Sequence, residues 1–135
     1  MLRAVETGPA VVVCSTCRLS PDQREDAGGQ RGGALLAEAL RDVQRDDPAL
    51  AGVAVQEMPC LFACQRHCVV HVRAPGKVGY VLGGFRPGEE EARAILEYAA
   101  RHTASAEGVV PYGEWPDGVK GRFITRTPPE GFVCT

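Results

Sequence analysis

The stretch VVVCSTC, residues 11–17, decides the fold that this sequence predicts. Val11 to Val13 form a short run of β-branched residues, which is typical of a strand buried on both faces. Cys14 follows the run directly, and Cys17 comes after a two-residue spacer. Thiolates at this spacing can point at one metal because a tight turn brings both sulfurs to one side. We therefore expect a buried strand that ends in a pair of metal-binding cysteines.

The next part of the chain predicts a helix and a second strand. A polar, glycine-rich loop over 18–33 precedes apolar residues that repeat at helical spacing over 34–46, and Pro48 follows them. Val53 and Val55 alternate with small or polar residues and indicate a second short strand. A strand, a helix and a strand in this order predict a right-handed β-α-β crossover with the two strands parallel.

A β-hairpin and a second helix follow. Residues 69–73 and 78–82 are rich in valine and flank the turn sequence APGK at 74–77. The acidic run that starts at Glu89 suits the positive end of a helix dipole, and apolar residues then repeat at helical spacing to near His102. A β-α-β unit, a β-hairpin and a C-terminal helix are the elements of a thioredoxin-like α/β domain.

The chain divides into a domain and a tail. We expect the thioredoxin-like domain to span residues 1–107, because the periodic hydrophobic patterns all lie there. Residues 108–135 are rich in proline, glycine and aromatic side chains, which predicts an irregular tail.

A second cysteine cluster, CLFACQRHC at residues 60–68, follows the second predicted strand. Cys60 and Cys64 therefore follow the second strand, as the first pair of cysteines follows the first. Because parallel neighbouring strands end at the same edge of a sheet, the two pairs should meet there. Four thiolates can hold either an iron–sulfur cluster or a structural zinc ion. The sequence thus predicts one site made by Cys14, Cys17, Cys60 and Cys64.

Three kinds of chemistry fit this set of cysteines. The first is a 2Fe–2S cluster, and the second is zinc or another thiophilic metal on the same four ligands. The third is dithiol redox chemistry at Cys14 and Cys17, because thioredoxins carry their reactive pair after the first strand. The long loop over 18–33 argues against the third, since a reactive pair normally opens the helix.

Two further cysteines have open roles. Cys68 is a candidate extra ligand, because a helical stretch over 60–68 would place it on one face with Cys60 and Cys64. Alternatively, it is a small buried residue that begins a strand. Cys134, near the C-terminal end of the sequence, is expected to be a free thiol. Cations that could surround the site are Arg18, Arg66, His67 and Lys77.

Length and composition limit the classes of function. The 135 residues fit one domain with a real core, and the net charge of −2 offers no basic field for nucleic acid. No apolar run approaches the ~20 residues that span a bilayer, and the first residues lack the apolar stretch of a secretory signal. We therefore expect a cytoplasmic protein with no membrane association, in which clustered cysteines bind metal or act in catalysis more often than they form disulfides.

The sequence resembles the thioredoxin-like 2Fe–2S ferredoxins, a group that includes a subunit of respiratory complex I. VVVC at 11–14, CLFAC at 60–64 and the hairpin sequence over 69–80 carry the resemblance, which covers about residues 9–102. It implies a 2Fe–2S cluster on the four cysteines, a homodimer, and one-electron transfer between a reductase and an acceptor enzyme. There are two departures. The first two cysteines are closer together than in those ferredoxins, a spacing common in zinc sites, which keeps zinc open. Cys68 is an additional thiol where those ferredoxins usually lack one.

The chain is more closely similar to a bacterial family of predicted metal-binding proteins of unknown function. CSTCR at 14–18, the cysteine triplet of 60–68, APGK at 74–77 with Tyr80, and Val110-Pro111 carry this similarity. Some members are encoded near cobalamin-pathway genes. Our interpretation is an electron carrier rather than an enzyme. The alternatives are a zinc-binding protein or metallochaperone without redox work, and a thiol–disulfide oxidoreductase.

Overall fold

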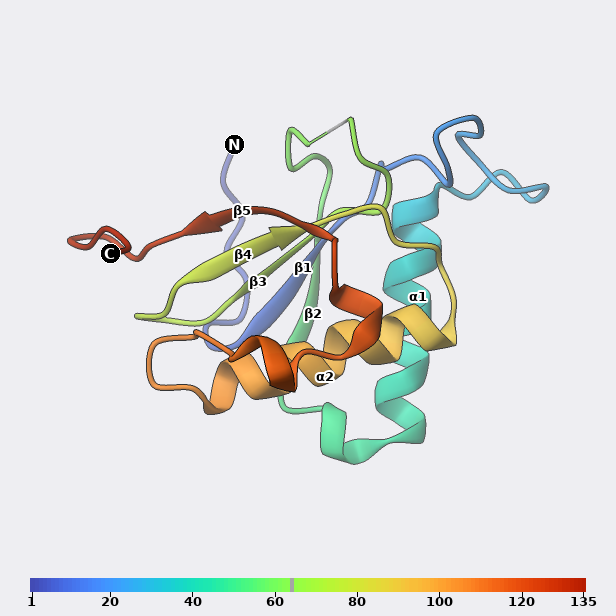
Figure 1. Cartoon of the computed structure of the whole chain (residues 1–135). Coiled ribbons are helices and arrows are strands. Elements are labelled where there is room, and N and C mark those ends of the chain that lie inside the picture. Colours follow the sequence, from blue (N-terminus) through green and yellow to red (C-terminus); the bar gives the residue numbers. More distant parts are fainter. Residues whose placement is uncertain (64) are drawn as a thin grey trace.

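The computed structural model describes residues 1–63 and 65–135 (Figure 1). These residues form one sheet with the strands β1 (Ala10–Cys14), β2 (Ala54–Met58), β3 (Val70–Arg73), β4 (Gly79–Leu82) and β5 (Phe123–Thr127). The α-helices are α1 (Gly32–Asp46) and α2 (Glu89–Ala104), and the short 3-10 turns are η1 (Pro48–Leu50), η2 (Tyr112–Glu114) and η3 (Asp117–Val119). None of the described helices is long and apolar enough to cross a membrane.

The strand order in the sheet is β2-β1-β3-β4-β5. β1 and β2 are parallel, with Val11 opposite Val55, and each of the other neighbouring pairs is antiparallel. The predicted β-α-β unit, hairpin and second helix are therefore confirmed, and with them the thioredoxin-like fold class. β1 lies between two other strands, which explains why all five of its residues are buried.

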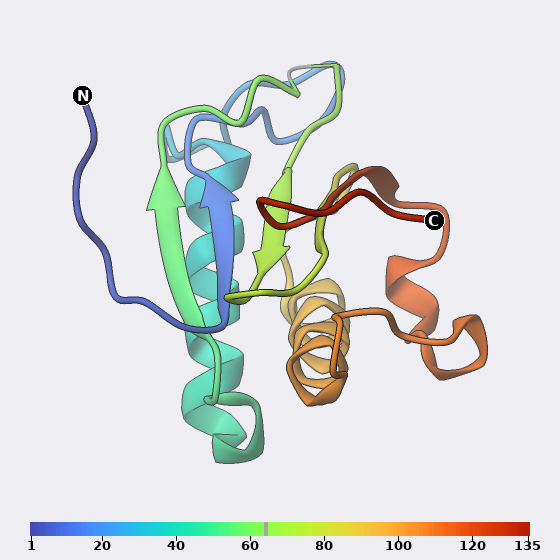
Figure 2. The ribbon, with the colours of Figure 1, turned by 90° about the vertical axis from the view of Figure 1, so that its left-hand side faces the viewer.

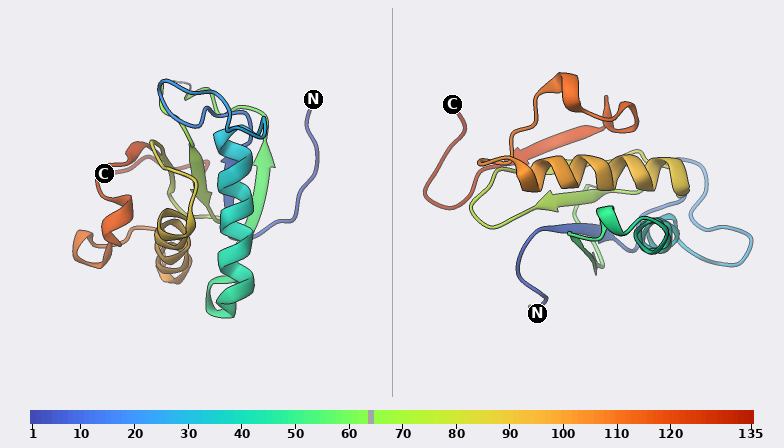
Figure 3. Two further views of the ribbon diagram at one scale, coloured as in Figure 1. Left: turned by 90° about the vertical axis from the view of Figure 1, so that its right-hand side faces the viewer. Right: turned by 90° about the horizontal axis from the view of Figure 1, so that it is seen from below.

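The two helices pack against each other and share one core with the sheet (Figure 3). In α1, Leu36, Leu40 and Val43 are buried at helical spacing and meet Val11 and Val13 of β1 in the main cluster of buried residues. Each fully buried side chain of this size contributes roughly 1.5–3 kcal/mol to folding. The apolar pattern that predicted α1 is therefore the face that holds this helix on the sheet.

The last part of the chain contains a strand that the sequence did not predict. β5 pairs with β4 and forms one edge of the sheet. The preceding segment packs on α2 through Trp115, whose indole Nε1–H donates to the carbonyl of Val110 at 2.8 Å. The ring of Trp115 lies 4.4 Å from that of Phe123 and 6.3 Å from that of Tyr98. This aromatic cluster ties residues 108–127 to the helix and the sheet.

Candidate metal centre

The turn CSTC follows the central strand and is held from three sides. Cys14 is the last residue of β1, and its N–H donates to the carbonyl of Val69 at 3.0 Å. The N–H of Cys17 donates back to the carbonyl of Cys14 at 3.3 Å, which closes the turn. The carbonyl of Cys17 accepts from Gly33 at the start of α1, at 3.2 Å. The backbone that carries both cysteines is therefore fixed by these bonds.

A glycine allows α1 to lie directly against this turn. A Cβ atom on Gly33 would lie 1.8 Å from the carbonyl oxygen of Cys14, far inside van der Waals contact. Gly32 is similarly close, because its Cβ would lie 2.3 Å from the carbonyl oxygen of Arg18. The helix begins two residues earlier than predicted because this backbone contact outweighs the poor helix propensity of glycine.

The second cysteine segment lies at the same end of the sheet, next to the first (Figure 2). The N–H of Ser15 donates to the carbonyl of Met58 at 2.9 Å, and the hydroxyl of Thr16 donates to the carbonyl of Pro59. These bonds join the residues that follow β1 to the last residue of β2 and to the residue after it. The parallel pairing of the two strands therefore delivers Cys60 to the CSTC turn, as expected from the topology.

Backbone N–H groups point at two of the sulfurs. The N–H of Phe62 donates to Sγ of Cys60 at 3.2 Å, and the N–H of Val69 donates to Sγ of Cys17 at 3.4 Å. The first bond accompanies a left-handed backbone at Phe62, with φ of 58°. A non-glycine residue rarely adopts this conformation, and such residues are frequent at functional sites.

Three of the predicted ligands line one cavity. Cys14, Cys17 and Cys60 share a cavity of about 430 Å³. The remaining lining residues are Thr16, Arg18, Arg24, Arg31, Ala63 and Arg66. Cys64, the fourth predicted ligand, lies outside the described residues. Within residues 1–63 and 65–135, no three His, Cys, Asp or Glu side chains approach closely enough to hold a metal ion.

The side chains of Cys14 and Cys17 shift each other's pKa in opposite directions. The Cys17 side chain lowers the pKa of Cys14 to about 5, although burial opposes the change. The Cys14 side chain and burial together raise the pKa of Cys17. Cys14 is therefore the more acidic thiol of the pair, and thiolate is the form that binds metals and attacks disulfides.

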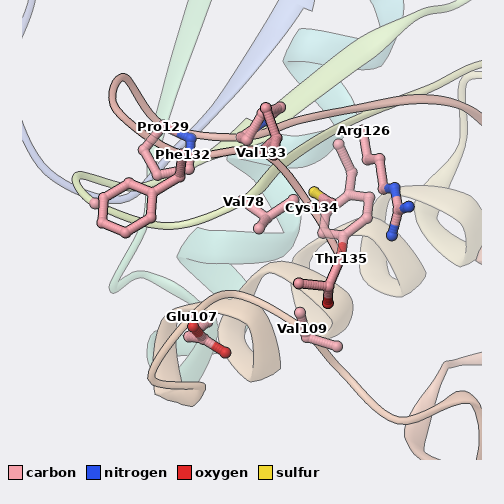
Figure 4. Close-up of a pocket in the computed structure, with 12 residues that line it drawn as sticks. Val78, Glu107, Val109, Arg126, Pro129, Phe132, Val133, Cys134 and Thr135 are labelled. Atoms are coloured by element: carbon pink, nitrogen blue, oxygen red, sulfur yellow. The ribbon is translucent and has the colours of Figure 1, made fainter.

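Cys68 and Cys134 do not line this cavity. Cys68 is completely buried in the main core, its thiol donates to the carbonyl of Arg18 at 3.5 Å, and burial raises its pKa to about 12. Cys134 lines a different cavity, of about 240 Å³, between the C-terminal residues and the β3–β4 hairpin (Figure 4). The structure thus groups Cys14, Cys17 and Cys60 around one cavity, with Cys68 buried behind Arg18 and Cys134 at a different cavity.

The residues that line the cavity fit a thiolate-bound metal centre by their donor chemistry. They supply three thiols and four guanidinium groups, and the adjacent backbone N–H groups of Phe62 and Val69 donate to two of the sulfurs. Hydrogen bonds to sulfur and nearby positive charge are the features by which proteins stabilise and tune anionic iron–sulfur centres. The sequence identified Arg18 and Arg66, but not Arg24, Arg31 or the N–H donors. Arg24 and Arg31 lie in the loop over 18–33, and no local sequence pattern predicts that this loop folds back to the cysteine cavity.

The fold and the site define a thioredoxin-like α/β protein with thiols gathered at the carboxyl ends of two parallel strands. The family described as "Protein of unknown function (DUF1636)" matches residues 11–129, and the chain belongs to this family. This finding confirms the similarity to a family of unknown function.

A solved structure, described as a thioredoxin-like [2Fe-2S] ferredoxin from Aquifex aeolicus, is similar to this chain. The TM-score is 0.50 and the sequence identity 23%, over 95% of this chain and 100% of that chain. At this identity the likeness confirms the fold. No curated protein matches the chain.

Proposed function

We propose that this protein is a thioredoxin-like 2Fe–2S ferredoxin that transfers single electrons between a reductase and an acceptor enzyme. The observation that carries the proposal is the shared cavity of Cys14, Cys17 and Cys60 at the end of β1 and β2. Cys64 follows Cys60 in sequence after three residues and supplies the fourth thiolate. The solved ferredoxin with the same fold supports the choice of a 2Fe–2S cluster over other thiolate-bound groups.

The side chains and backbone around the cavity would set the properties of such a centre. A bound 2Fe–2S cluster supplies reversible one-electron chemistry. The N–H groups of Phe62 and Val69 donate to cysteine sulfurs, and guanidinium groups line the cavity, so both features favour the more negative, reduced form. Cys14, which is 4% exposed, keeps one side of the centre away from water.

The direct test is a visible absorption spectrum with iron, sulfide and zinc analysis on protein purified without oxygen. We expect absorption between roughly 320 and 460 nm that dithionite bleaches, with two irons and two sulfides per chain. Cys64→Ser should abolish the colour, whereas Cys134→Ser, which changes a cysteine at the other cavity, should keep it. A colourless protein with one zinc per chain would contradict the electron-transfer proposal and identify a zinc site or metallochaperone.

A second candidate function is thiol–disulfide exchange at Cys14 and Cys17. The turn that places both cysteines together, with a Cys17 side chain that lowers the pKa of Cys14 to about 5, favours it, because a reactive dithiol needs one stabilised thiolate. In this case the Cys14 thiolate of Cys17→Ser should attack a disulfide substrate, release one substrate thiol and stay trapped in the mixed disulfide, with the metal content unchanged. Loss of the metal in Cys17→Ser, without a trapped disulfide, would support the ferredoxin instead.

A further inference from the structure

We propose that the rim of the cysteine cavity is the docking site for a partner protein with an acidic surface. The proposal rests on the proposed function, because this partner would be the electron donor or acceptor. The arginine rim consists of Arg18, Arg24, Arg31 and Arg66, which line the cavity together with the three cysteines. Among the residues that the structure describes, no Asp or Glu lines it. The chain as a whole has a net charge of −2, so positive charge is concentrated at this site against the overall sign.

The charges of the arginine rim are not neutralised within the described part of the chain. Arg41, Arg93 and Arg122 all pair with carboxylates at 2.8–3.1 Å. None of the ion pairs in residues 1–63 and 65–135 includes a member of the rim. The acidic Asp26 lies on the same loop, but its carboxylate accepts from the N–H groups of Gly28 and Gln30. The rim therefore keeps its charge for an external anion.

The guanidinium groups also keep hydrogen-bond donors. Arg31 uses Nη1 to donate to the carbonyl of Thr16 at 3.0 Å, and the buried Nε of Arg18 has no hydrogen-bond partner among residues 1–63 and 65–135. Arg24 and Arg66 are exposed, and no hydrogen bond occupies their side chains within the described residues. Guanidinium groups recognise carboxylates with two parallel hydrogen bonds, which gives geometry as well as attraction. Carboxylate side chains are the matching groups on a partner.

A bound cluster would not cancel the rim. An oxidised two-iron centre with four thiolates carries roughly two net negative charges, and the four guanidinium groups outnumber them. The face of the protein through which an electron would leave therefore remains positive. Charge complementarity of this kind steers partners into place and raises association rates by about 10- to 1000-fold.

An exposed aromatic residue lies beside the rim. Phe62 is 93% exposed, and it lies between Cys60 and Ala63, which both line the cavity. Its left-handed backbone places the N–H on the sulfur of Cys60 and leaves the ring in solvent. Aromatic residues and arginines dominate the binding energy of many protein interfaces. An apolar contact within a ring of positive charge fits a protein surface better than a small anion.

The test measures binding of two labelled peptides by fluorescence anisotropy. One has about ten glutamates, and the other has two leucines at the centre of the same sequence. We expect both to bind at low ionic strength and to weaken as salt rises from about 20 to 200 mM, because screening shortens the range of the charges. A variant with Arg24→Gln, Arg31→Gln and Arg66→Gln should lose about tenfold or more in affinity for both peptides.

The matched control carries Arg86→Gln, Arg101→Gln and Arg126→Gln, three exposed arginines without ion pairs in the described residues. It changes the net charge equally and should bind as the unaltered protein does. Equal loss in both triple variants would overturn the proposal, since binding would then follow net charge alone. Competition by inorganic phosphate at matched ionic strength would also overturn it and indicate a small-anion site.

Phe62→Asn tests the apolar contact, because asparagine tolerates a left-handed backbone and lacks the ring. The variant should bind the leucine-containing peptide about tenfold more weakly and the all-glutamate peptide as tightly as the unaltered protein does. If the variant and the unaltered protein bind the leucine-containing peptide equally well, Phe62 is not part of the interface. Iron analysis of the same samples separates the two proposals. Iron-free protein that binds through the rim contradicts only the ferredoxin, and cluster-loaded protein that binds neither peptide contradicts only the docking site.

Discussion

Replacing Gly33 with alanine tests the contact that positions the cysteine turn. The added Cβ would lie 1.8 Å from the carbonyl oxygen of Cys14 and 2.9 Å from its carbonyl carbon, both of which are backbone atoms that cannot rotate away. α1 or the turn must therefore move. Overpacking of this kind costs about 1–3 kcal/mol, and loss of the Gly33–Cys17 hydrogen bond adds about 0.5–1.5 kcal/mol. The higher helix propensity of alanine returns at most about 1 kcal/mol.

We therefore expect Gly33→Ala to lower the free energy of unfolding by about 1–3 kcal/mol, measured by urea denaturation. Gly52→Ala is the matched control, because a Cβ there meets no atom within 4 Å, and it should change the stability by less than about 0.5 kcal/mol. The metal content of Gly33→Ala should fall together with its stability. A variant as stable as the unaltered protein would refute the idea that this contact holds the turn in place.

Three other predictions concern stability and the cysteines. Burial lowers the pKa of His102, so as the pH falls the unfolded chain takes up a proton near pH 6.5, before the folded protein does. The free energy of unfolding should therefore decrease as the pH drops below about 6.5, by at most about 1.4 kcal/mol per pH unit. His102→Gln, which can still donate to Val78, should flatten this part of the urea midpoint–pH curve, and an unchanged slope would exclude His102 as its source. Trp115→Ala should lower the free energy of unfolding by about 2 kcal/mol in thermal melts, because it removes the ring contacts and the hydrogen bond to Val110. An unchanged melting temperature would show that the aromatic cluster does not hold residues 108–127 in place. Cys68→Ala should cost about 1 kcal/mol and keep the full metal content in elemental analysis, whereas loss of metal would make Cys68 a ligand.

Sequence patterns predicted the parts of this fold that bury continuous apolar surface. The valines of β1 and the helical spacing of Leu36, Leu40 and Val43 arise from burial in one core, and periodicity reports burial directly. The meeting of Cys60 with the CSTC turn followed from topology, because parallel strands end at one edge. These inferences needed no detail of side-chain packing.

The features that sequence patterns missed depend on contacts between distant segments. β5 is short and mostly exposed, and the ring of its first residue, Phe123, packs against the ring of Tyr80, with 5.5 Å between the ring centroids. The left-handed backbone of Phe62 depends on the sulfur of Cys60, since nothing in an aromatic residue favours that conformation. The folding of the loop over 18–33 brings Arg24 and Arg31 to the cavity, and loops without periodicity give no sign of such placement.

The two helix N-termini differ in how the chain compensates their dipoles. α2 begins with Glu89, Glu90 and Glu91, which compensate its dipole, whereas α1 has no acidic residue in its first turn and no side-chain cap. Its N-cap residue is Arg31, which lines the cysteine cavity. The positive end of α1 therefore adds to the arginine rim instead of being neutralised by the chain itself. An anionic thiolate centre at the CSTC turn would supply the compensation that the sequence of α1 omits.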